Sequence, residues 1–164
     1  MNTVFKHGLV QTVHMAQVQQ ELAALRQALD QDPNNVMALV RMGNMHMDAS
    51  MYDKAADYYR RALEVDPNNP DVRTDMGACL REMGKPQEAL AEFEKSLSQD
   101  PNHWKSWFNI AIVNLYDLGD YEKADAAFRK VVELNPGALD MNAVEAEIEK
   151  VKAQKGAAAT RSPS

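Results

Sequence analysis

A short phrase built around proline recurs four times along the chain at nearly constant spacing. Pro33, Pro67, Pro101 and Pro136 lie 34, 34 and 35 residues apart, and an Asp or Asn precedes each of them. A period of about 20–50 residues is typical of stacked-repeat proteins, in which each unit buries its apolar face against its neighbours. The spacing therefore predicts an array of similar units whose function lies in the surface that they form together.

Each full repeat (36–69, 70–103 and 104–137) contains two apolar stretches of helical periodicity joined by a short turn. Gly84 and Gly119 lie where a first helix must end, because glycine accepts the left-handed conformation found after a helix. Pro86 suits the first turn of the next helix. The proline phrases end each second helix, because the residue before proline disfavours the α conformation. The sequence therefore predicts three helix pairs.

Small residues recur at one position in each helix. They are Gly43, Gly77 and Ala111 in the first helices, and Ala55, Ala89 and Ala124 in the second helices. We expect these residues to face each other, so that the two backbones of a pair approach closely. We expect the ring four positions later (Tyr59, Phe93 or Phe128) to fill the space between neighbouring units.

The residues at these positions resemble the tetratricopeptide repeat (TPR) family. The first repeat carries Leu39-x2-Met42-Gly43, Tyr52, Ala55, Tyr59, Ala62 and Pro67, and the third carries Trp107-x2-Ile110-Ala111, Ala124, Phe128 and Pro136. The resemblance covers residues 36–137. It implies an all-α fold, a right-handed superhelical solenoid of antiparallel helix pairs, with a concave groove lined by the first helices.

Both ends of the chain depart from the full repeat. Residues 1–35 are expected to form a helical arm and a degenerate repeat, with Val18, Leu22, Leu25 and Leu29 in its second helix and Leu25 at the aromatic position. The apolar residues within 4–13 form either its partner helix or an amphipathic arm. Residues 138–154 are expected to be a capping helix that covers the last apolar face, and residues 155–164 a disordered tail.

Two departures lie within the repeats. The third repeat is one residue longer, with the extra residue placed within 115–119. A turn insertion is the favoured interpretation, and a π-bulge is the alternative, because one added residue rotates a helix face by about 100°. Arg73 replaces a large apolar residue, and we expect its stem to pack while its charged head reaches water.

The sequence contains no pattern typical of catalysis or of metal binding. His46 is interpreted as a packed structural residue, and His7 and His14 lack further ligands at zinc-site spacing. Cys79 occupies a core-like position, so we expect a buried thiol. There is no phosphate-binding glycine loop and no calcium loop. We therefore predict no enzymatic activity, no catalytic residue, no metal and no cofactor.

Charge and hydropathy exclude two classes of partner. The net charge is −6 without a basic stripe, so nucleic acid is not expected as a partner. No apolar run reaches the roughly 18 residues of a membrane helix, and the first 20 residues do not resemble a signal peptide. These observations favour a cytoplasmic location, or a periplasmic one if an N-terminal anchor has been removed.

The groove implied by the resemblance is the predicted binding site for a protein partner. Its residues are Met37, Val40, Arg41, Asn44 and Met47 in the first repeat, Asp71, Thr74, Asp75, Ala78 and Arg81 in the second, and Lys105, Phe108, Asn109, Ile112 and Leu115 in the third. The alternative is that they are ordinary surface residues of a spacer. The apolar members would contact the partner, the basic members would orient acidic side chains, and Asp71 and Asp75 would meet basic ones.

Some TPR proteins bind the C-terminal carboxylate of heat-shock chaperones through a clamp of Lys and Asn, then Asn, then Lys and Arg. The corresponding positions here hold Val40 and Asn44, then Asp75, then Lys105 and Asn109. Two of the five match, and Asp75 would repel a carboxylate. The sequence therefore argues against this clamp.

Three functions remain open from the sequence. The favoured one is a non-enzymatic adaptor or scaffold that binds a peptide or helix of a partner protein in the groove. The second is a homo-oligomer assembled through the N-terminal arm or the terminal faces. The third is the regulatory subunit of an enzyme carried on another chain.

Overall fold

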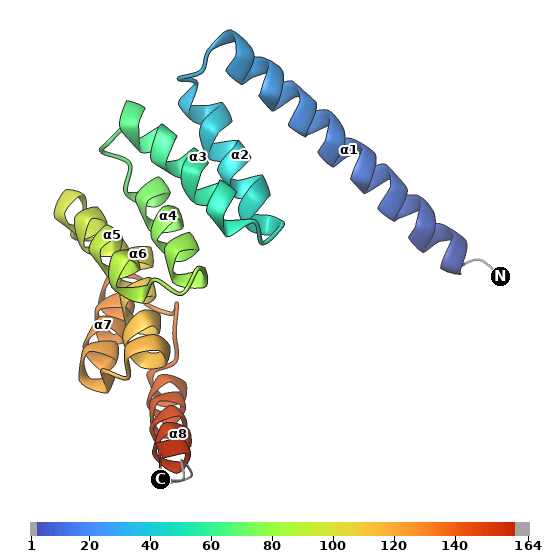
Figure 1. Ribbon diagram of the computed structural model, residues 1–164. Helices are drawn as coiled ribbons and strands as arrows, with labels where there is room; N and C mark the ends of the chain where they lie inside the picture. The colour runs from blue at the N-terminus through green and yellow to red at the C-terminus, as the bar shows by residue number, and fades with distance from the viewer. Residues whose placement is uncertain (1–2, 160–164) are drawn as a thin grey trace. The chain divides into compact units, whose positions relative to one another are not determined.

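The computed structural model describes the backbone of residues 3–159 and the side chains of residues 15–157. All regular structure in this range is helical, which confirms the all-α fold (Figure 1). The chain divides into two compact units, Met1–Asp66 (unit 1) and Pro67–Ser164 (unit 2). No helix within the described range is long and apolar enough to cross a membrane.

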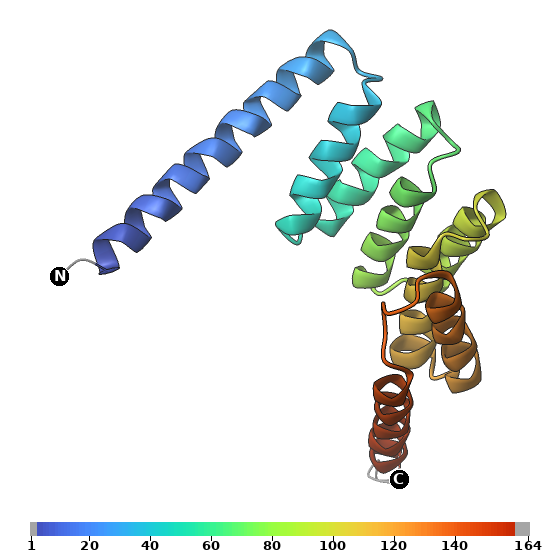
Figure 2. The same cartoon turned by 180° about the vertical axis from the view of Figure 1, so that it is seen from behind.

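Unit 1 consists of α1 (Thr3–Gln31), α2 (Val36–Asp48) and α3 (Tyr52–Val65). The side chain of Asn35 starts α2 by accepting a 3.0 Å hydrogen bond from the backbone N–H of Ala38. Helices α2 and α3 lie side by side as an antiparallel pair, as both views show (Figures 1 and 2). Leu39, Met42 and Tyr59 are buried between them and form the centre of this pair.

The glycines in the first helices make room for an aromatic ring. A Cβ added to Gly43 would lie 2.5 Å from Cε1 of Tyr59, and one added to Gly77 would lie 2.5 Å from Cε1 of Phe93. Each ring therefore packs on the glycine of its own helix pair. This contact was not predicted, whereas Phe93 also packs against Val113 and Ile110 of the next repeat, as expected for the ring.

Helix α1 is continuous, and from Met15 to its end none of its side chains is buried. Leu22, Leu25 and Leu29 are half-buried, and Glu21 forms an ion pair with Arg41 of α2. Since one helix runs from Thr3 to Gln31, residues 4–13 do not form a separate partner helix that folds back. The side chains of residues 4–13, which carry the predicted amphipathic arm, lie outside those described.

Unit 2 contains two helix pairs and a final helix. Its elements are α4 (Pro70–Glu82), α5 (Pro86–Gln99), α6 (Trp104–Ile112), η1 (Val113–Leu118), α7 (Tyr121–Leu134) and α8 (Met141–Ala159). The side chains of Asn69 and Asp120 cap α4 and α7, at 3.1 and 3.2 Å from the backbone nitrogens of Val72 and Lys123. Gly84 ends its turn at φ +75°, in the left-handed region that favours glycine.

The extra residue of the third repeat is accommodated by a π-helix. Element η1 continues α6 without a break and ends at Gly119, whose φ is +72° and whose N–H bonds to the carbonyl of Asn114, five residues earlier. A π turn holds one residue more than an α turn, so the helix keeps its direction. The favoured interpretation as a turn insertion is wrong, and the π-bulge alternative is confirmed.

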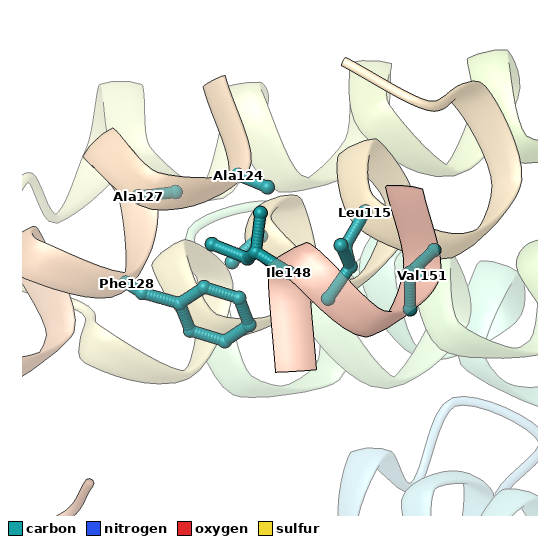
Figure 3. Close-up of a cluster of buried hydrophobic side chains, with 7 residues drawn as sticks. Leu115, Ala124, Ala127, Phe128, Ile148 and Val151 are labelled. Atoms are coloured by element: carbon teal, nitrogen blue, oxygen red, sulfur yellow. The ribbon is translucent and has the colours of Figure 1, made fainter. Parts of the chain in front are cut away.

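Helix α8 covers the apolar face left by the last helix pair. Ile148 and Val151 of α8 are buried against Leu115, Ala124 and Phe128 (Figure 3). The helix spans Met141–Ala159, so it starts after the expected residue 138 and continues into the segment expected to be a disordered tail. Residues 160–164 of that predicted tail lie outside the described residues.

Arg73 differs from its predicted environment. Its Nη1 donates a 2.9 Å hydrogen bond to Oε2 of Glu92 on α5, and the two side chains are only 12% and 13% exposed. Its Nη2 donates a 2.8 Å hydrogen bond to the carbonyl of Pro67. The prediction that the head reaches water is therefore wrong, because the guanidinium joins α4 to α5 through a largely buried ion pair.

Candidate functional site

The predicted groove residues of unit 1 are mostly engaged within the unit. Met37 is 82% exposed, whereas Val40, Asn44 and Met47 are half-buried. The hydroxyl of Tyr59 donates a 2.7 Å hydrogen bond to Oδ1 of Asn44. Arg41 forms an ion pair with Glu21. The most exposed of these five side chains is therefore Met37, which is apolar.

Two predicted groove residues of unit 2 are not on the surface. Thr74 is 3% exposed and Leu115 is 1% exposed. The hydroxyl of Thr74 donates to the carbonyl of Pro70 at 2.8 Å, and the π-helix turns Leu115 into the cluster beneath α8. Leu115 therefore cannot supply a contact surface, and the prediction for it is wrong. Thr74 adds only a small exposed area to the lining of the hollow described next.

Other predicted residues of unit 2 line a shared hollow. This unit 2 hollow has a volume of about 500 Å³ and lies between α4, α6, the end of α7 and the segment before α8. Its lining includes the predicted residues Asp75, Lys105, Phe108 and Asn109, together with Trp104 and Leu139. Phe108 is half-buried and meets Phe128 edge to face, with 6.1 Å between the ring centroids. The Phe108 ring therefore packs against Phe128 on one side and borders the hollow on the other.

Ala78, Arg81 and Ile112 are half-buried elsewhere in unit 2 and do not line this hollow. Ile112 packs against the core beneath α8. Trp104 and Leu139, in contrast, border it and were not predicted. Trp104 is 36% exposed. A large aromatic residue at the start of a helix was a signal available in the sequence. Leu139 borders the hollow only because the chain turns after α7, and nothing in the sequence indicated this.

The basic residues predicted to orient a partner are already paired. Nζ of Lys105 donates a 2.7 Å hydrogen bond to Oδ1 of Asp71, and Nε of Arg81 donates a 2.5 Å hydrogen bond to Oδ2 of Asp117. The Lys105 contact holds the pKa of Asp71 below its ordinary value. These cations therefore have acidic partners in their own unit.

Asp75 differs from its acidic neighbour. It is half-buried, and among the described residues it takes part in no ion pair of the kind that joins Asp71 to Lys105. Burial, together with the nearby charge of Asp71, raises the pKa of Asp75 to about 6. Desolvation disfavours the charged form, and a like charge adds to this effect. Lys105 and His103 act in the opposite direction and lower the pKa of Asp75 to a smaller extent, but neither forms an ion pair with it among the described residues.

A buried polar cluster behind the hollow was missed by the sequence reasoning. Nδ1 of His103 lies 2.8 Å from Oγ of Ser106, and its Nε2 lies 3.3 Å from Oδ1 of Asp71. Ser106 Oγ also lies 2.9 Å from Oγ of Ser96 and 2.7 Å from Oγ1 of Thr74. The order Ser–His–Asp is that of a hydrolase triad, but Ser106 is 0% exposed and no substrate carbonyl can reach it. The cluster instead ties α4, α5 and α6 together.

Hydroxyls at core positions were the available signal for this cluster. Ser96 occupies the position held by Ala62 and Val131 in the other repeats. A buried hydroxyl needs a hydrogen-bond partner, and so it predicts further polar residues nearby.

The remaining candidates for chemistry have structural roles. Nδ1 of His46 lies 2.7 Å from the carbonyl of Met42, and its ring lies 5.1 Å from that of Tyr58, in agreement with the expected structural role. Cys79 is buried, and burial raises the pKa of its thiol to about 11. Within the described residues, no group of three His, Cys, Asp or Glu side chains is placed to hold a metal ion.

A larger hollow of about 990 Å³ lies beside α7 and α8. It is lined mostly by charged side chains that pair with one another, as Arg129 does with Asp125 at 2.8 Å and with Glu145 at 3.0 Å. Exposed pairs of this kind contribute little binding energy, and the lining offers few apolar anchors. The smaller unit 2 hollow is therefore the better candidate.

Comparison with protein families identifies the family of this helix array. Residues 6–141 match the family model described as the cytochrome c-type biogenesis protein H TPR domain. The chain belongs to this TPR family. No curated protein matches the chain significantly.

Solved structures support the same fold. MamA superposes with a TM-score of 0.69 at 19% identity, over 78% of this chain and 74% of that one. The Sgt2 TPR domain from Aspergillus fumigatus gives 0.63 at 26% identity, over 79% of this chain and 85% of that one. The first TPR of Spaghetti (RPAP3), bound to the HSP90 peptide SRMEEVD, gives 0.66 at 21% identity, over 74% and 96%. At these identities the likeness establishes the TPR fold.

Proposed function

We propose that this TPR protein is a non-enzymatic adaptor that holds a segment of a partner protein in the unit 2 hollow. The observation that carries the proposal is the hollow itself, with a volume of about 500 Å³ and with Trp104, Phe108 and Leu139 at its wall. Aromatic anchors in a partly desolvated pocket supply most of the binding energy in protein interfaces. The polar groups beside them, Asp75 and Asn109, would set the orientation of the segment.

The family supplies the class of partner. Its description refers to c-type cytochrome biogenesis, and so we propose that the bound segment belongs to a protein of that process. The polypeptide of a c-type cytochrome, before its haem is attached, is the first partner to test. A chaperone C-terminus of the kind bound by RPAP3 is disfavoured, because Asp75 faces the site and Lys105 is already paired.

Fluorescence anisotropy tests this proposal with labelled, overlapping 15-residue segments of a c-type apocytochrome. At least one segment should bind, and Trp104→Ala should weaken it about tenfold, the usual effect of losing an interface anchor. Tyr116→Ala is the matched control, because Tyr116 is 39% exposed and lies outside the unit 2 hollow, compared with 36% for Trp104. No binding by any segment, or equal loss in both variants, would contradict the proposal.

Self-assembly is the second candidate, and the surface of α1 favours it. Between Met15 and Gln31 this helix buries no side chain, and Met15 and Val18 are 61% and 37% exposed. A second copy of the chain could cover these residues. Light scattering of the full chain and of a variant without residues 1–16 distinguishes the candidates. A concentration-dependent oligomer that vanishes on truncation supports assembly, and a monomer in both cases rejects it.

A further inference from the structure

The charges around the unit 2 hollow do not balance. Asp71 and Lys105 neutralise each other across a 2.7 Å contact, whereas Asp75, one helical turn after Asp71, has no such partner among the described residues. Arg81 is bound to Asp117, and so it is not free to turn toward Asp75. The hollow therefore presents one excess negative charge, although the sequence suggested a mixture of signs.

From this imbalance we infer that the segment entering the hollow carries a Lys or Arg next to an apolar side chain, and that Asp75 binds its cationic group. The inference rests on the proposed function and adds the chemistry of the partner. Asp75 becomes a specificity-determining residue of the site. Acidic segments are excluded by the same charge.

The desolvation of Asp75 strengthens such a pair. A charge in a partly buried site interacts more strongly than one in bulk water, because the effective dielectric constant is lower. The carboxylate is already separated from much of its water, which raises its pKa to about 6. The free protein already carries most of the desolvation cost of the Asp75 carboxylate. A cation that binds there therefore gains the electrostatic attraction without adding that cost again.

The apolar wall suits the stem of the same side chain. Lys and Arg bury their methylene groups along apolar surfaces while the charged head remains in polar surroundings. Trp104 and Phe108 lie on the face of α6 that borders the hollow, together with Asp75 on α4. A guanidinium or ammonium near these rings gains a further attraction from the aromatic face.

Selection from a random 12-residue peptide library displayed on phage, with the full chain as bait, tests the inference without a known ligand. Sequences selected by the wild type should be enriched in Arg or Lys beside an apolar residue, and Asp75→Asn should lose the basic enrichment. Enrichment of acidic or uncharged sequences would overturn the inference and leave the proposed function intact. Selection of no sequence would refute the proposed function itself, and the inference with it.

A charge comparison then measures the contact directly. The strongest selected peptide is synthesised with its basic residue as Arg and again as citrulline, which keeps the shape and removes the charge. Wild type should prefer the Arg form about tenfold, and Asp75→Asn should bind both forms equally. Glu94→Gln makes the same charge change on the exposed face of α5, outside the hollow, and should keep the preference. An unchanged preference in Asp75→Asn would overturn the inference, whatever the stability of the variant.

Discussion

Replacing Asp75 with asparagine should stabilise the folded protein at neutral pH. Its pKa rises from an ordinary 3.8 to about 6, so the folded state disfavours the charged form. One pKa unit corresponds to about 1.4 kcal/mol, which gives a cost of about 3 kcal/mol at most. Solvent screening of a half-buried group reduces the expected gain for Asp75→Asn to about 1–2 kcal/mol. Since Asp75 forms no ion pair, the substitution removes no salt bridge among the described residues.

The dependence on pH identifies the cause. About one pH unit or more above its folded-state pKa of about 6, Asp75 is charged in both states, and its full cost is present. As the pH falls from about 6 toward 4 the folded state binds the proton first, so the cost disappears. Urea unfolding followed by circular dichroism should show a midpoint about 0.5–1 M higher for Asp75→Asn at pH 7.5, and little difference near pH 4. An equal gain at both pH values, or an equal gain in Glu94→Gln, would refute the electrostatic reasoning.

Three further predictions concern the helix array. Gly77→Ala should lower the melting temperature, because its Cβ would lie 2.5 Å from the Phe93 ring and overpacking costs about 1–3 kcal/mol; Gly156→Ala, with nothing within 4 Å, should not. Deleting the exposed residue Tyr116 should change the melting temperature less than a deletion within α5, because it converts the π turn to an α turn. Cys79 should react with a thiol reagent at pH 8 only in urea, because it is buried and its pKa is raised to about 11; rapid reaction of the native protein would contradict its placement.

The repeat explains why so much of the fold could be predicted. Helix boundaries followed from local chemistry, as at Pro86 in the first turn of α5 and at Gly84 in the left-handed conformation. Core positions such as Leu39 and Met42 followed from apolar spacing. The π-helix could not be predicted with certainty, because one extra residue can be accommodated in a turn as well as in a helix. Only the packing of Leu115 in the core decides between them.

The candidate site was predicted less completely because its properties depend on contacts between repeats. Asp71 and Lys105 occupy equivalent positions one repeat apart, so their pairing was open to prediction from the alignment of repeats. The partner of Arg81 is Asp117, which lies inside the π-helix where the extra residue changes the alignment of the repeats. That Asp75 has no ion-pair partner becomes clear only when both pairs are known. Lys105 and Arg81 were predicted to orient acidic side chains of a partner, but both are already paired with acidic residues of unit 2.

The proposed function requires that a partner segment binds beside Asp75 and Trp104. Nuclear magnetic resonance of the ¹⁵N-labelled full chain, titrated with the tightest apocytochrome segment, tests it most directly. The indole signal of Trp104 and the amides of α6 and residues 135–139 should shift. The indole of Trp107, which donates a 3.0 Å hydrogen bond to the carbonyl of Pro101 and does not line the hollow, should change little. Shifts confined to α5 or α8, or to α1, would place the binding site elsewhere and contradict the claim.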